Sequence, residues 1–470
     1  MIDEYYAVRV NRVSPEFPIP VLLSEDDKPI STVPGGAANV CYQMKYWNAD
    51  VHLLSVLTDT GSPTITSHNF NCDYSVTLKD GWKMPRKKRF YDGDFPLDRW
   101  DVEAKGSFRT NTPEWSEVRR KLLNNFTQMV KNVKPDIVIL SDYGKGVFVS
   151  GSENISRMLI EFCARKDIPV IVDPKSISTE LWSGCTVIKP NADWAKAFCN
   201  KYAEHLDTLE DYMEYISQAL FAQEVVLTRS GDGVGIHDRY KEETDFYPSA
   251  FLSKKRPIIR SVIGAGDCFC AFFAMAKALG IPLKGAVSVA FNGSSAYIED
   301  KHNSPVTPYR FQKWFDPIGA KRVSLEKLLA IKKQTPNQTW VWTNGCFDIM
   351  HAGHLKTFEE AKKLGDKLIV GINTDESVKM LKGDNRPILP YNQREALISS
   401  LEHVDFVVPI SDKKPGGIIR QLMPNMIVKG GDYKVEEIDG WEVVGKDNVY
   451  TVSLLPGVST SKIIERIKNG

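Results

Sequence analysis

The sequence predicts an α/β protein of two domains, each built on a mainly parallel sheet covered by helices. The chain has 470 residues, which is long for one domain. Strand-like apolar runs alternate with helical patterns along most of its length, as in βαβ folds. This alternation stops at a basic connector and starts again at "WVWTNG", residues 340–345. We therefore expect a first domain at 1–315, a linker at 316–337 and a second domain at 338–470.

Four apolar runs define the expected sheet of the first domain. They are "DIVILSD" at 136–142, "IPVIVDPK" at 168–175, "CTVIKPN" at 185–191 and "EVVLTRSG" at 224–231. Each run ends in polar residues. Because ligands of parallel α/β sheets gather outside the carboxyl ends of the strands, we expect a binding site at this edge.

The composition excludes several classes of protein. With 60 basic and 59 acidic residues the net charge is +1, so no global charge favours nucleic acid or a membrane surface. The longest apolar stretch, residues 268–280, is shorter than the ~20 residues that a membrane span requires. The first ten residues lack the features of a secretory signal, and the eight cysteines show no paired spacing for disulfides or structural zinc. We expect a cytoplasmic protein.

The second domain opens with "TNGCFDIMHAGHL", residues 343–355, which is expected to form a strand end, a glycine turn and a helix start. The amino terminus of a helix presents free N–H groups and a partial positive charge, which favour phosphate. Gly345 and Gly353 would let a phosphate chain approach the backbone, while His351 and His354 could donate hydrogen bonds to it. Two alternatives remain: a zinc pair, although helical zinc pairs usually lie four residues apart, and purely structural histidines.

The first domain has its own candidate phosphate loop, "VIGAGDCFC", at residues 262–270. Gly264 and Gly266 can adopt tight backbone angles, so that their N–H groups and that of Asp267 form an anion-binding concavity. Asp267 could accept the proton of an attacking hydroxyl group. The alternative is an ordinary aspartate at a helix start.

The order of the motifs resembles a known pair of enzyme families. "PGGAANV", "LSDYGKG", "IVDPK", "IKPN", "LTRSGDG" and "GAGD" resemble the ribokinase-like sugar kinases over residues 1 to about 310. "TNGCFDIMHAGH", "LKGDNRPI", "VKGGDY" and "GVSTSKII" resemble the HxGH cytidylyltransferase-like nucleotidyltransferases, a Rossmann-like fold. Their fusion resembles the bifunctional heptose 7-phosphate kinase/heptose 1-phosphate adenylyltransferases.

This resemblance implies two reactions. The first domain would phosphorylate the anomeric hydroxyl of D-glycero-D-manno-heptose 7-phosphate with ATP. The second would transfer AMP from ATP to heptose 1-phosphate and release pyrophosphate, for ADP-heptose and lipopolysaccharide core synthesis. It also implies a homodimer. Magnesium is expected to accompany ATP at both sites because of the triphosphate charge.

The resemblance also implies roles for residues of the first domain. Asp267 would be catalytic. The expected sugar-binding residues are Asp3, Gly35, Gly36, Asn39, Lys87, Arg89 and Arg99. The basic segment around Lys87 could instead be an ordinary solvated charge run. The expected nucleotide-binding residues are Lys175, Lys189, Asn191, Thr228, Gly231, Gly264, Ala265, Gly266 and Asn292.

In the second domain the resemblance implies that His351, His354 and Lys382 are catalytic. The expected nucleotide-binding residues are Asn344, Gly345, Phe347, Asp348, Gly353, Asn373, Asp375, Arg386, Lys429, Ser459, Thr460 and Ser461. Asp432 belongs to the same "VKGGDY" motif as Lys429.

Three departures from the kinase pattern leave alternatives open. The family opens with an apolar strand ending in Gly-Asp before the segment that matches "IDEYY", so we expect either a first domain without its first strand or a start further upstream. The family motif Asn-x-x-Glu reads Asn191-Ala-Asp-Trp194 here, and Ser261 and Ile263 replace common polar partners. A second hypothesis is therefore that the first domain is a binding or dimerisation scaffold and only the second catalyses. Fold alone names neither the sugar nor the base of the nucleotide.

Overall fold

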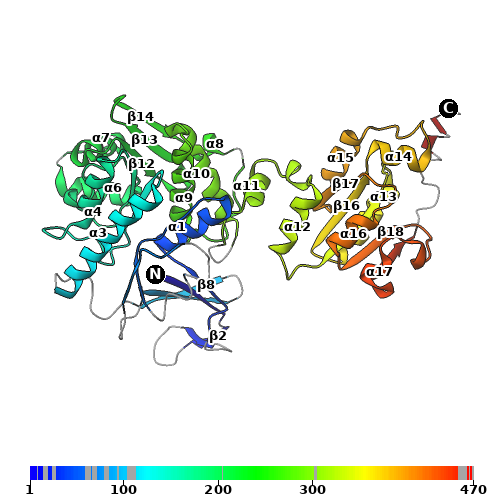
Figure 1. Ribbon diagram of the computed structural model, residues 1–470, viewed down its shortest axis with the longest axis horizontal. Coiled ribbons are helices and arrows are strands. Elements are labelled where there is room, and N and C mark those ends of the chain that lie inside the picture. Colours follow the sequence, from blue (N-terminus) through cyan, green and yellow to red (C-terminus); the bar gives the residue numbers. More distant parts are fainter. Residues whose placement is uncertain are drawn as a thin grey trace. The chain divides into compact units, whose positions relative to one another are not determined.

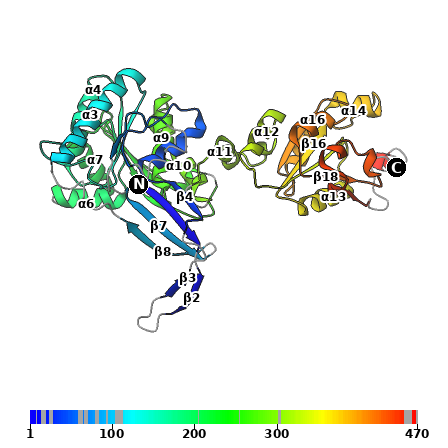
Figure 2. The same ribbon diagram turned by 60° about the horizontal axis from the view of Figure 1, so that its bottom comes forward.

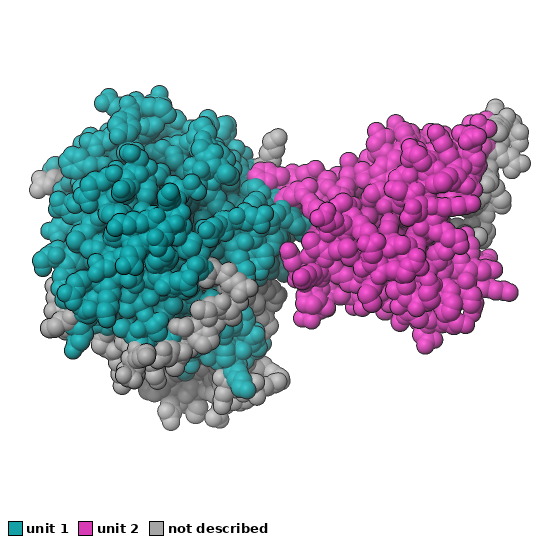
Figure 3. Space-filling view, in the orientation of Figure 1, with its two compact units in different colours: residues 1–311 teal, residues 312–470 magenta. Residues whose placement is uncertain are grey.

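The computed structural model divides into two compact units, residues Met1–Phe311 and Gln312–Gly470, which Figure 3 shows in different colours. Each unit is described by itself. The structure describes residues 1–7, 9–13, 20–23, 28–58, 65, 71–78, 84–92, 95–102, 113–203, 205–253, 255–300, 304–453, 463–464 and 466–467.

The main sheet of the first unit has six strands in the order β14-β13-β12-β11-β10-β9. Strands β9 to β12 are parallel, and β13 and β14 are added antiparallel at one edge. The bounds are β9 Val138–Ser141, β10 Val170–Asp173, β11 Val187–Ile188, β12 Glu224–Thr228, β13 Val234–Asp238 and β14 Glu243–Tyr247.

Helices cover both faces of this sheet (Figure 1). Val170 and Val172 of β10 belong to a core shared with α3, α4, α6 and α7, whereas Ile171 between them is equally buried and points to the opposite face. On that side α9 packs against α10 and α1. The bounds are α1 Ala37–Met44, α3 Pro113–Val133, α4 Ile155–Ala164, α5 Thr179–Trp182, α6 Ala192–Tyr202, α7 Leu209–Leu220, α8 Ser249–Leu252, α9 Ala265–Ala278 and α10 Leu283–Ile298. The next helix, α11 Pro308–Phe315, spans the boundary between the two units in the sequence.

A second sheet of the first unit has the order β4-β1-β7-β8 (Figure 2). Only the central pair, β1 and β7, is parallel. Its strands are β1 Ile2–Ala7, β4 Ser31–Pro34, β7 Arg86–Asp92 and β8 Phe95–Val102. Two small pairs complete the unit: β2 Arg9–Val13 with β3 Pro20–Leu23, and β5 Val56–Thr58 with β6 Val76–Leu78. The turn after β4 leads directly into α1, so "PGGAANV" connects the second sheet to the helical layer.

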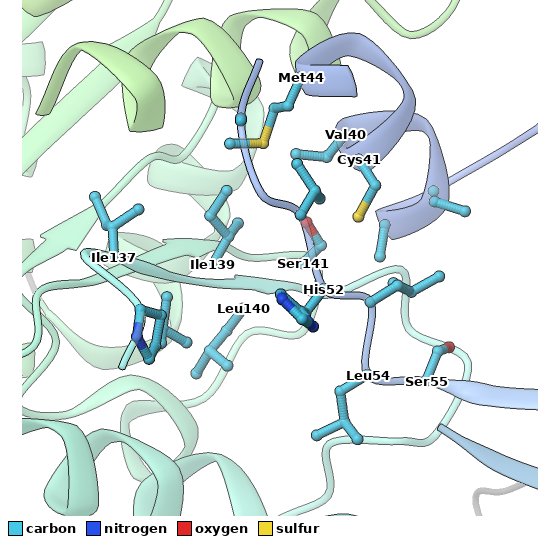
Figure 4. A pocket seen from close by; sticks show the side chains of 18 of the residues that line it. Val40, Cys41, Met44, His52, Leu54, Ser55, Ile137, Ile139, Leu140 and Ser141 are labelled. Carbon is cyan, nitrogen blue, oxygen red and sulfur yellow. The ribbon is translucent and has the colours of Figure 1, made fainter. Parts of the chain in front are cut away.

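A cavity of about 710 Å³ lies between β9 and residues 51–56, next to α1 (Figure 4). Ile139 and Leu140 of β9 line it together with Ile137 just before the strand, and Val40 and Met44 line it from the helix. Among the described residues, no strand pairs with the edge of β9 that borders this cavity. Gly36 and Tyr143 also line it, and Tyr143 belongs to the candidate site described below.

The second unit contains a five-stranded, fully parallel sheet in the order β17-β16-β15-β18-β19. From β15 the chain builds outward first through β16 and β17 and then through β18 and β19, so β15 lies at the switch point where ligands of such sheets bind. The strands are β15 Trp340–Gly345, β16 Lys367–Asn373, β17 Phe406–Ile410, β18 Met426–Gly430 and β19 Val449–Val452. The helices are α12 Leu325–Lys333, α13 Ala352–Lys363, α14 Asp375–Lys382, α15 Tyr391–Ser399, α16 Gly416–Leu422 and α17 Trp441–Val444.

Two further observations concern segments singled out in the sequence. Residues 316–337, the expected linker, contain α12, which packs against α16 and β17 of the second unit. In the part of the chain that the structure describes, no helix is both long enough and apolar enough to cross a membrane.

Candidate active sites

The carboxylate of Asp267 is the centre of the candidate site in the first unit. It lies in the first turn of α9, the helix that begins directly after Gly264. The φ of Gly264 is 80°, a left-handed conformation that favours glycine. One carboxylate oxygen accepts a hydrogen bond from Asn39 Nδ2 at 2.7 Å, and the other accepts one from the Tyr143 hydroxyl. Burial raises the pKa of Asp267 to about 6, although these hydrogen bonds and the Lys189 ammonium oppose the shift. Asp267 can therefore act as a proton acceptor near neutral pH.

Charged groups from three strand ends surround this carboxylate. Lys189, after β11, pairs with Asp173 at the end of β10 at 2.9 Å. Burial alone would lower the pKa of Lys189, but the Asp173 carboxylate outweighs it and the pKa is raised, so the lysine stays cationic. Asp142, after β9, accepts hydrogen bonds from the backbone N–H groups of Gly144, Lys175 and Ser176. The edge predicted from the sequence thus holds a positive charge next to Asp267.

The expected sugar-binding residues lie mostly on β1, β7 and the turn after β4. Asp3 and Arg89 form a buried ion pair at 2.6 Å. A Cβ atom on Gly35 would stand 2.4 Å from Asp3 Oδ2, so only glycine allows this approach. Lys87 is half-buried, and burial lowers its pKa. Arg99 lies on β8 opposite Arg89, is largely exposed, and pairs with Asp101 at 2.9 Å.

Four of the expected nucleotide-binding residues lie in two places of the first unit: three near the ends of β11 and β12, and one on α10. Asn191 and Thr228 are bridged neighbours at the carboxyl ends of β11 and β12, and Gly231 follows with open space around it. The side chain of Asn191 is used locally, because it accepts the N–H of Trp194 and caps α6. Asn292 is buried, and its amide nitrogen donates to the carbonyl groups of Leu252 and Ser288 at 2.8 Å each.

The two histidines of the second unit begin α13. His351 is the residue preceding the helix, and its ring stacks on that of His354 with centroids 3.8 Å apart. Neither Nδ1 atom has a hydrogen-bond partner among the described residues. Burial, together with the charges of His351 and Lys382, lowers the pKa of His354 to about 4. The two rings therefore keep buried nitrogens that no described residue uses, and His354 is neutral at physiological pH.

The described residues contain no group of three histidine, cysteine or acidic side chains that could hold a metal ion. The zinc interpretation of the histidine pair therefore has no third protein ligand in this part of the chain. The phosphate interpretation needs none, because the helix terminus and the rings supply the donors.

Several other expected residues surround the histidines. Lys429, on β18, donates to the backbone carbonyl of Asn344 at 2.8 Å, and burial lowers its pKa. Asp348 is buried and accepts the N–H groups of Ile388 and Leu389 while pairing with Arg386. Asp348 and Arg386 thus hold the loop after α14 in place. Asn373 donates to Ser377 Oγ at 2.8 Å. Gly345 ends β15, Phe347 lies in the segment that follows, and Gly353 lies in the first turn of α13. Ser459, Thr460 and Ser461 lie outside the described residues.

Arg394 holds parts of the second site together, although the sequence analysis did not identify it. It is fully buried on α15 and pairs with Asp375 at 2.6 Å. It also donates to the backbone carbonyls of Cys346 and Asn373 at 2.7 Å each, so it joins the carboxyl ends of β15 and β16. Its neighbours in sequence gave no clear signal, because its partners Cys346 and Asn373 lie 48 and 21 residues away in the chain.

Comparisons with known proteins fit both halves. A model of the pfkB family carbohydrate kinases matches residues 106–308, and a cytidylyltransferase-like model matches residues 342–466. The bifunctional protein HldE of Campylobacter jejuni subsp. doylei is 33% identical over 100% of this chain and 96% of its own length. That of Nitratiruptor sp. is also 33% identical, over 100% of this chain and 97% of its own. The chain belongs to the HldE family of bifunctional proteins.

The HldE likeness confirms the family resemblance and the expected pair of kinase and nucleotidyltransferase domains. The fold of the first unit is similar to that of phosphofructokinase-2 from Escherichia coli, with a TM-score of 0.50 over 67% of this chain and 95% of that one. The identity is only 15%, so this likeness concerns the fold alone. With the parallel sheet of the second unit, it confirms the predicted fold class.

Proposed function

We propose that this HldE-family chain is a bifunctional sugar-phosphate enzyme. It phosphorylates the anomeric hydroxyl of D-glycero-D-manno-heptose 7-phosphate with ATP, and it couples heptose 1-phosphate to AMP for ADP-heptose and lipopolysaccharide core synthesis. The observation that carries the proposal is that one chain holds two helix starts suited to phosphate, one beside an acceptor carboxylate and one beside two neutral imidazoles.

The first reaction uses Asp267 as the base. The anomeric oxygen attacks the γ-phosphorus of ATP, its proton passes to the Asp267 carboxylate, and the bond to the β-phosphate oxygen breaks as ADP leaves. Backbone N–H groups at the start of α9 face the region where phosphate charge gathers, and the Lys189 ammonium adds positive charge nearby. Most of the catalysis is then alignment and charge stabilisation, of which alignment alone can contribute about 7 to 11 kcal/mol.

The second reaction needs no covalent enzyme intermediate. A phosphate oxygen of heptose 1-phosphate attacks the α-phosphorus of ATP, and the bond to the pyrophosphate oxygen breaks. Neutral His351 and His354 donate hydrogen bonds as negative charge moves onto the pyrophosphate, and Lys382 and Lys429 balance that charge. Loss of one such donor typically costs about 3 to 4 kcal/mol of transition-state stabilisation.

The number of phosphate groups on the sugar requires a further reaction between these two steps. Phosphorylation of a 7-phosphate at its anomeric oxygen yields a sugar with phosphate at both ends. A phosphomonoester hydrolysis at C7 must therefore precede AMP transfer to heptose 1-phosphate. The intermediate has to leave this chain and return to it.

Magnesium enters as part of the ATP substrate. Mg²⁺ usually keeps several waters and binds phosphate oxygens with only one or two carboxylates. The described residues fit that role, since they contain no closed cluster of three potential metal ligands but offer carboxylates such as Asp173 beside the kinase site. We further propose that the enzyme acts in the cytoplasm as a homodimer.

The test supplies each sugar phosphate separately to the purified full-length protein with ATP and magnesium. We expect ADP with heptose 7-phosphate, and pyrophosphate with heptose 1-phosphate. Pyrophosphate without any ADP would favour the alternative in which the first unit is a scaffold. Faster turnover of another sugar phosphate, or of CTP in place of ATP, would replace the proposed substrate but keep the two reaction types.

A further inference from the structure

A buried chain of hydrogen bonds leads to Asp267 from the backbone of Val306. The Val306 N–H donates to Gln43 Oε1 at 3.1 Å, and Gln43 Nε2 donates to Asn39 Oδ1 at 3.2 Å. Asn39 Nδ2 then donates to Asp267 Oδ2 at 2.7 Å. Val306, Gln43 and Asn39 each have 0% exposure, so water cannot replace any of these contacts.

The direction of this chain is fixed at Val306. The oxygen and nitrogen of a side-chain amide have the same shape, so an isolated amide can face its neighbours either way. A backbone N–H can only donate, and therefore Gln43 must turn its oxygen toward Val306. The nitrogen of Gln43 then donates to Asn39, so Asn39 must present its side-chain oxygen as the acceptor. The nitrogen of Asn39 is thereby turned toward Asp267.

Val306 is itself held in place by the same helical segment. Its carbonyl accepts a hydrogen bond from Trp47 Nε1 at 2.8 Å, so both of its polar backbone groups are bound to the segment that begins with α1. Gln43 and Asn39 are four residues apart on α1, the spacing that places two side chains on one face of a helix. The fold around α1 therefore provides a rigid support for the amide of Asn39.

We infer that Gln43 is a positioning residue for the kinase reaction: through Asn39 it keeps a hydrogen-bond donor aimed at Asp267, so that this carboxylate stays ionised and correctly oriented for proton transfer. This inference rests on the proposed function, because it matters only if Asp267 accepts the proton of the sugar hydroxyl. It also assigns to Asn39 a role toward the base, in addition to any contact with the sugar.

Other groups also face Asp267, and two of them, the Tyr143 hydroxyl and the Lys189 ammonium, also favour its ionised form. Tyr143 donates from the loop after β9, and Lys189 and Asp173 face it as a paired charge from the strand ends. Tyr297 approaches from α10, and Cys268 and Cys270 lie on α9, the helix that carries Asp267. Burial raises the pKa values of both tyrosines and both thiols above the physiological range, so these groups stay neutral.

The decisive variant is Gln43→Glu. Glutamate still accepts the Val306 N–H but offers Asn39 a second acceptor, so the Asn39 amide must turn and present its oxygen to Asp267. Loss of this hydrogen bond to a charged carboxylate should shift the acid limb of the kcat/KM profile for ADP formation upward by at least about one pH unit. Below that limb, kcat/KM falls about tenfold.

Gln43→Met separates positioning from packing. Methionine leaves the Val306 N–H without a partner and is therefore at least as disruptive to packing, yet it lets Asn39 turn its nitrogen to Asp267 freely. The acid limb should move in the same direction but less than in Gln43→Glu. Ser217→Ala is the matched control, because Ser217 is equally buried in the same unit and binds only the carbonyl of Ala222. It should lower stability without moving the limb.

The outcomes are distinguishable. If the wild type forms ADP and Asp267→Asn does not, but neither Gln43 variant moves the acid limb, the positioning role is wrong and the proposed function stands. If the wild type forms no ADP, the proposed kinase function fails and the positioning role fails with it. If Gln43→Glu does not fold, the methionine variant decides between a shifted and an unshifted limb. Pyrophosphate formation from heptose 1-phosphate measures the amount of active second unit in every preparation, and thermal unfolding shows whether the first unit is folded.

Discussion

At the scale of single residues, His354 couples the second active site to pH. Its folded-state pKa, lowered by burial to about 4, lies below the unfolded value near 6.5. The folded protein therefore resists protonation, and stability present above pH 6.5 is lost as the pH falls toward 4. We expect the free energy of unfolding of the second unit, relative to that of His354→Gln, to fall by about 1 to 2 kcal/mol between pH 8 and pH 5.

Urea unfolding at the two pH values measures this difference, because glutamine has a similar polarity and does not titrate. Equal pH dependence of the wild type and the glutamine variant would contradict the buried, neutral state of His354. The same state implies that AMP transfer does not require an imidazolium, so its rate should not decline between pH 7 and pH 9 through deprotonation of this ring.

Residues that act through tertiary contacts mark the limit of what the sequence could predict. His351, His354 and Asp267 belong to local motifs, and the structure places each of them at a helix start as expected. Gln43 has no such motif, because its partner Val306 is 263 residues away in the chain. Arg394 likewise gains its role only when β15 and β16 lie side by side. Buried polar groups of this kind are defined by the fold and not by their neighbours in sequence.

At the scale of elements, the four apolar runs predicted the parallel core of the first sheet because buried parallel strands are continuously apolar. The second sheet, β4-β1-β7-β8, was not predicted. Its strands are rich in charged residues, and "RKKRFYD" of β7 suggested a solvated charge run as readily as a strand. Pairing with β1 at the register of Lys87 with Asp3 places several of these charges beside carboxylates and so makes the strand possible.

The start of α9 allows folding and phosphate binding to be tested separately. Gly264 has φ of 80°, so Gly264→Ala should destabilise the first unit by about 1 to 2 kcal/mol. Gly266 lies inside the helix, and an added Cβ would meet nothing within 4 Å. Gly266→Ala should therefore leave stability unchanged or slightly raised, since alanine favours helices by up to about 1 kcal/mol. Its methyl group would nevertheless occupy space beside the N–H groups proposed to hold phosphate.

Thermal unfolding and ADP formation measured on both variants decide this point. We expect Gly266→Ala to keep its melting temperature and to lose at least tenfold in kcat/KM for ATP in the kinase assay. Pyrophosphate formation in the second unit serves as the internal control. A fully active Gly266→Ala protein would show that phosphate does not approach this helix start.

At the scale of the whole molecule, the two proposed reactions are joined by an intermediate that must leave the protein. Hydrolysis at C7 belongs to neither half, so the sugar is released after phosphorylation whatever the arrangement of the two units. Asp267→Asn should therefore abolish ADP formation and keep AMP transfer, while His354→Ala should do the reverse. The mixing experiment uses an equimolar mixture of the two variants and a phosphatase that removes the 7-phosphate. It should convert heptose 7-phosphate to ADP-heptose at about half the rate of the same total amount of wild type.

The expected rate follows from the number of active sites. Each variant supplies one active site per chain, so half of each kind of site is present. A mixture that forms heptose 1-phosphate but no nucleotide sugar would mean that the second site accepts only sugar made by its own chain, and the two halves would then have to be regarded as one catalytic unit.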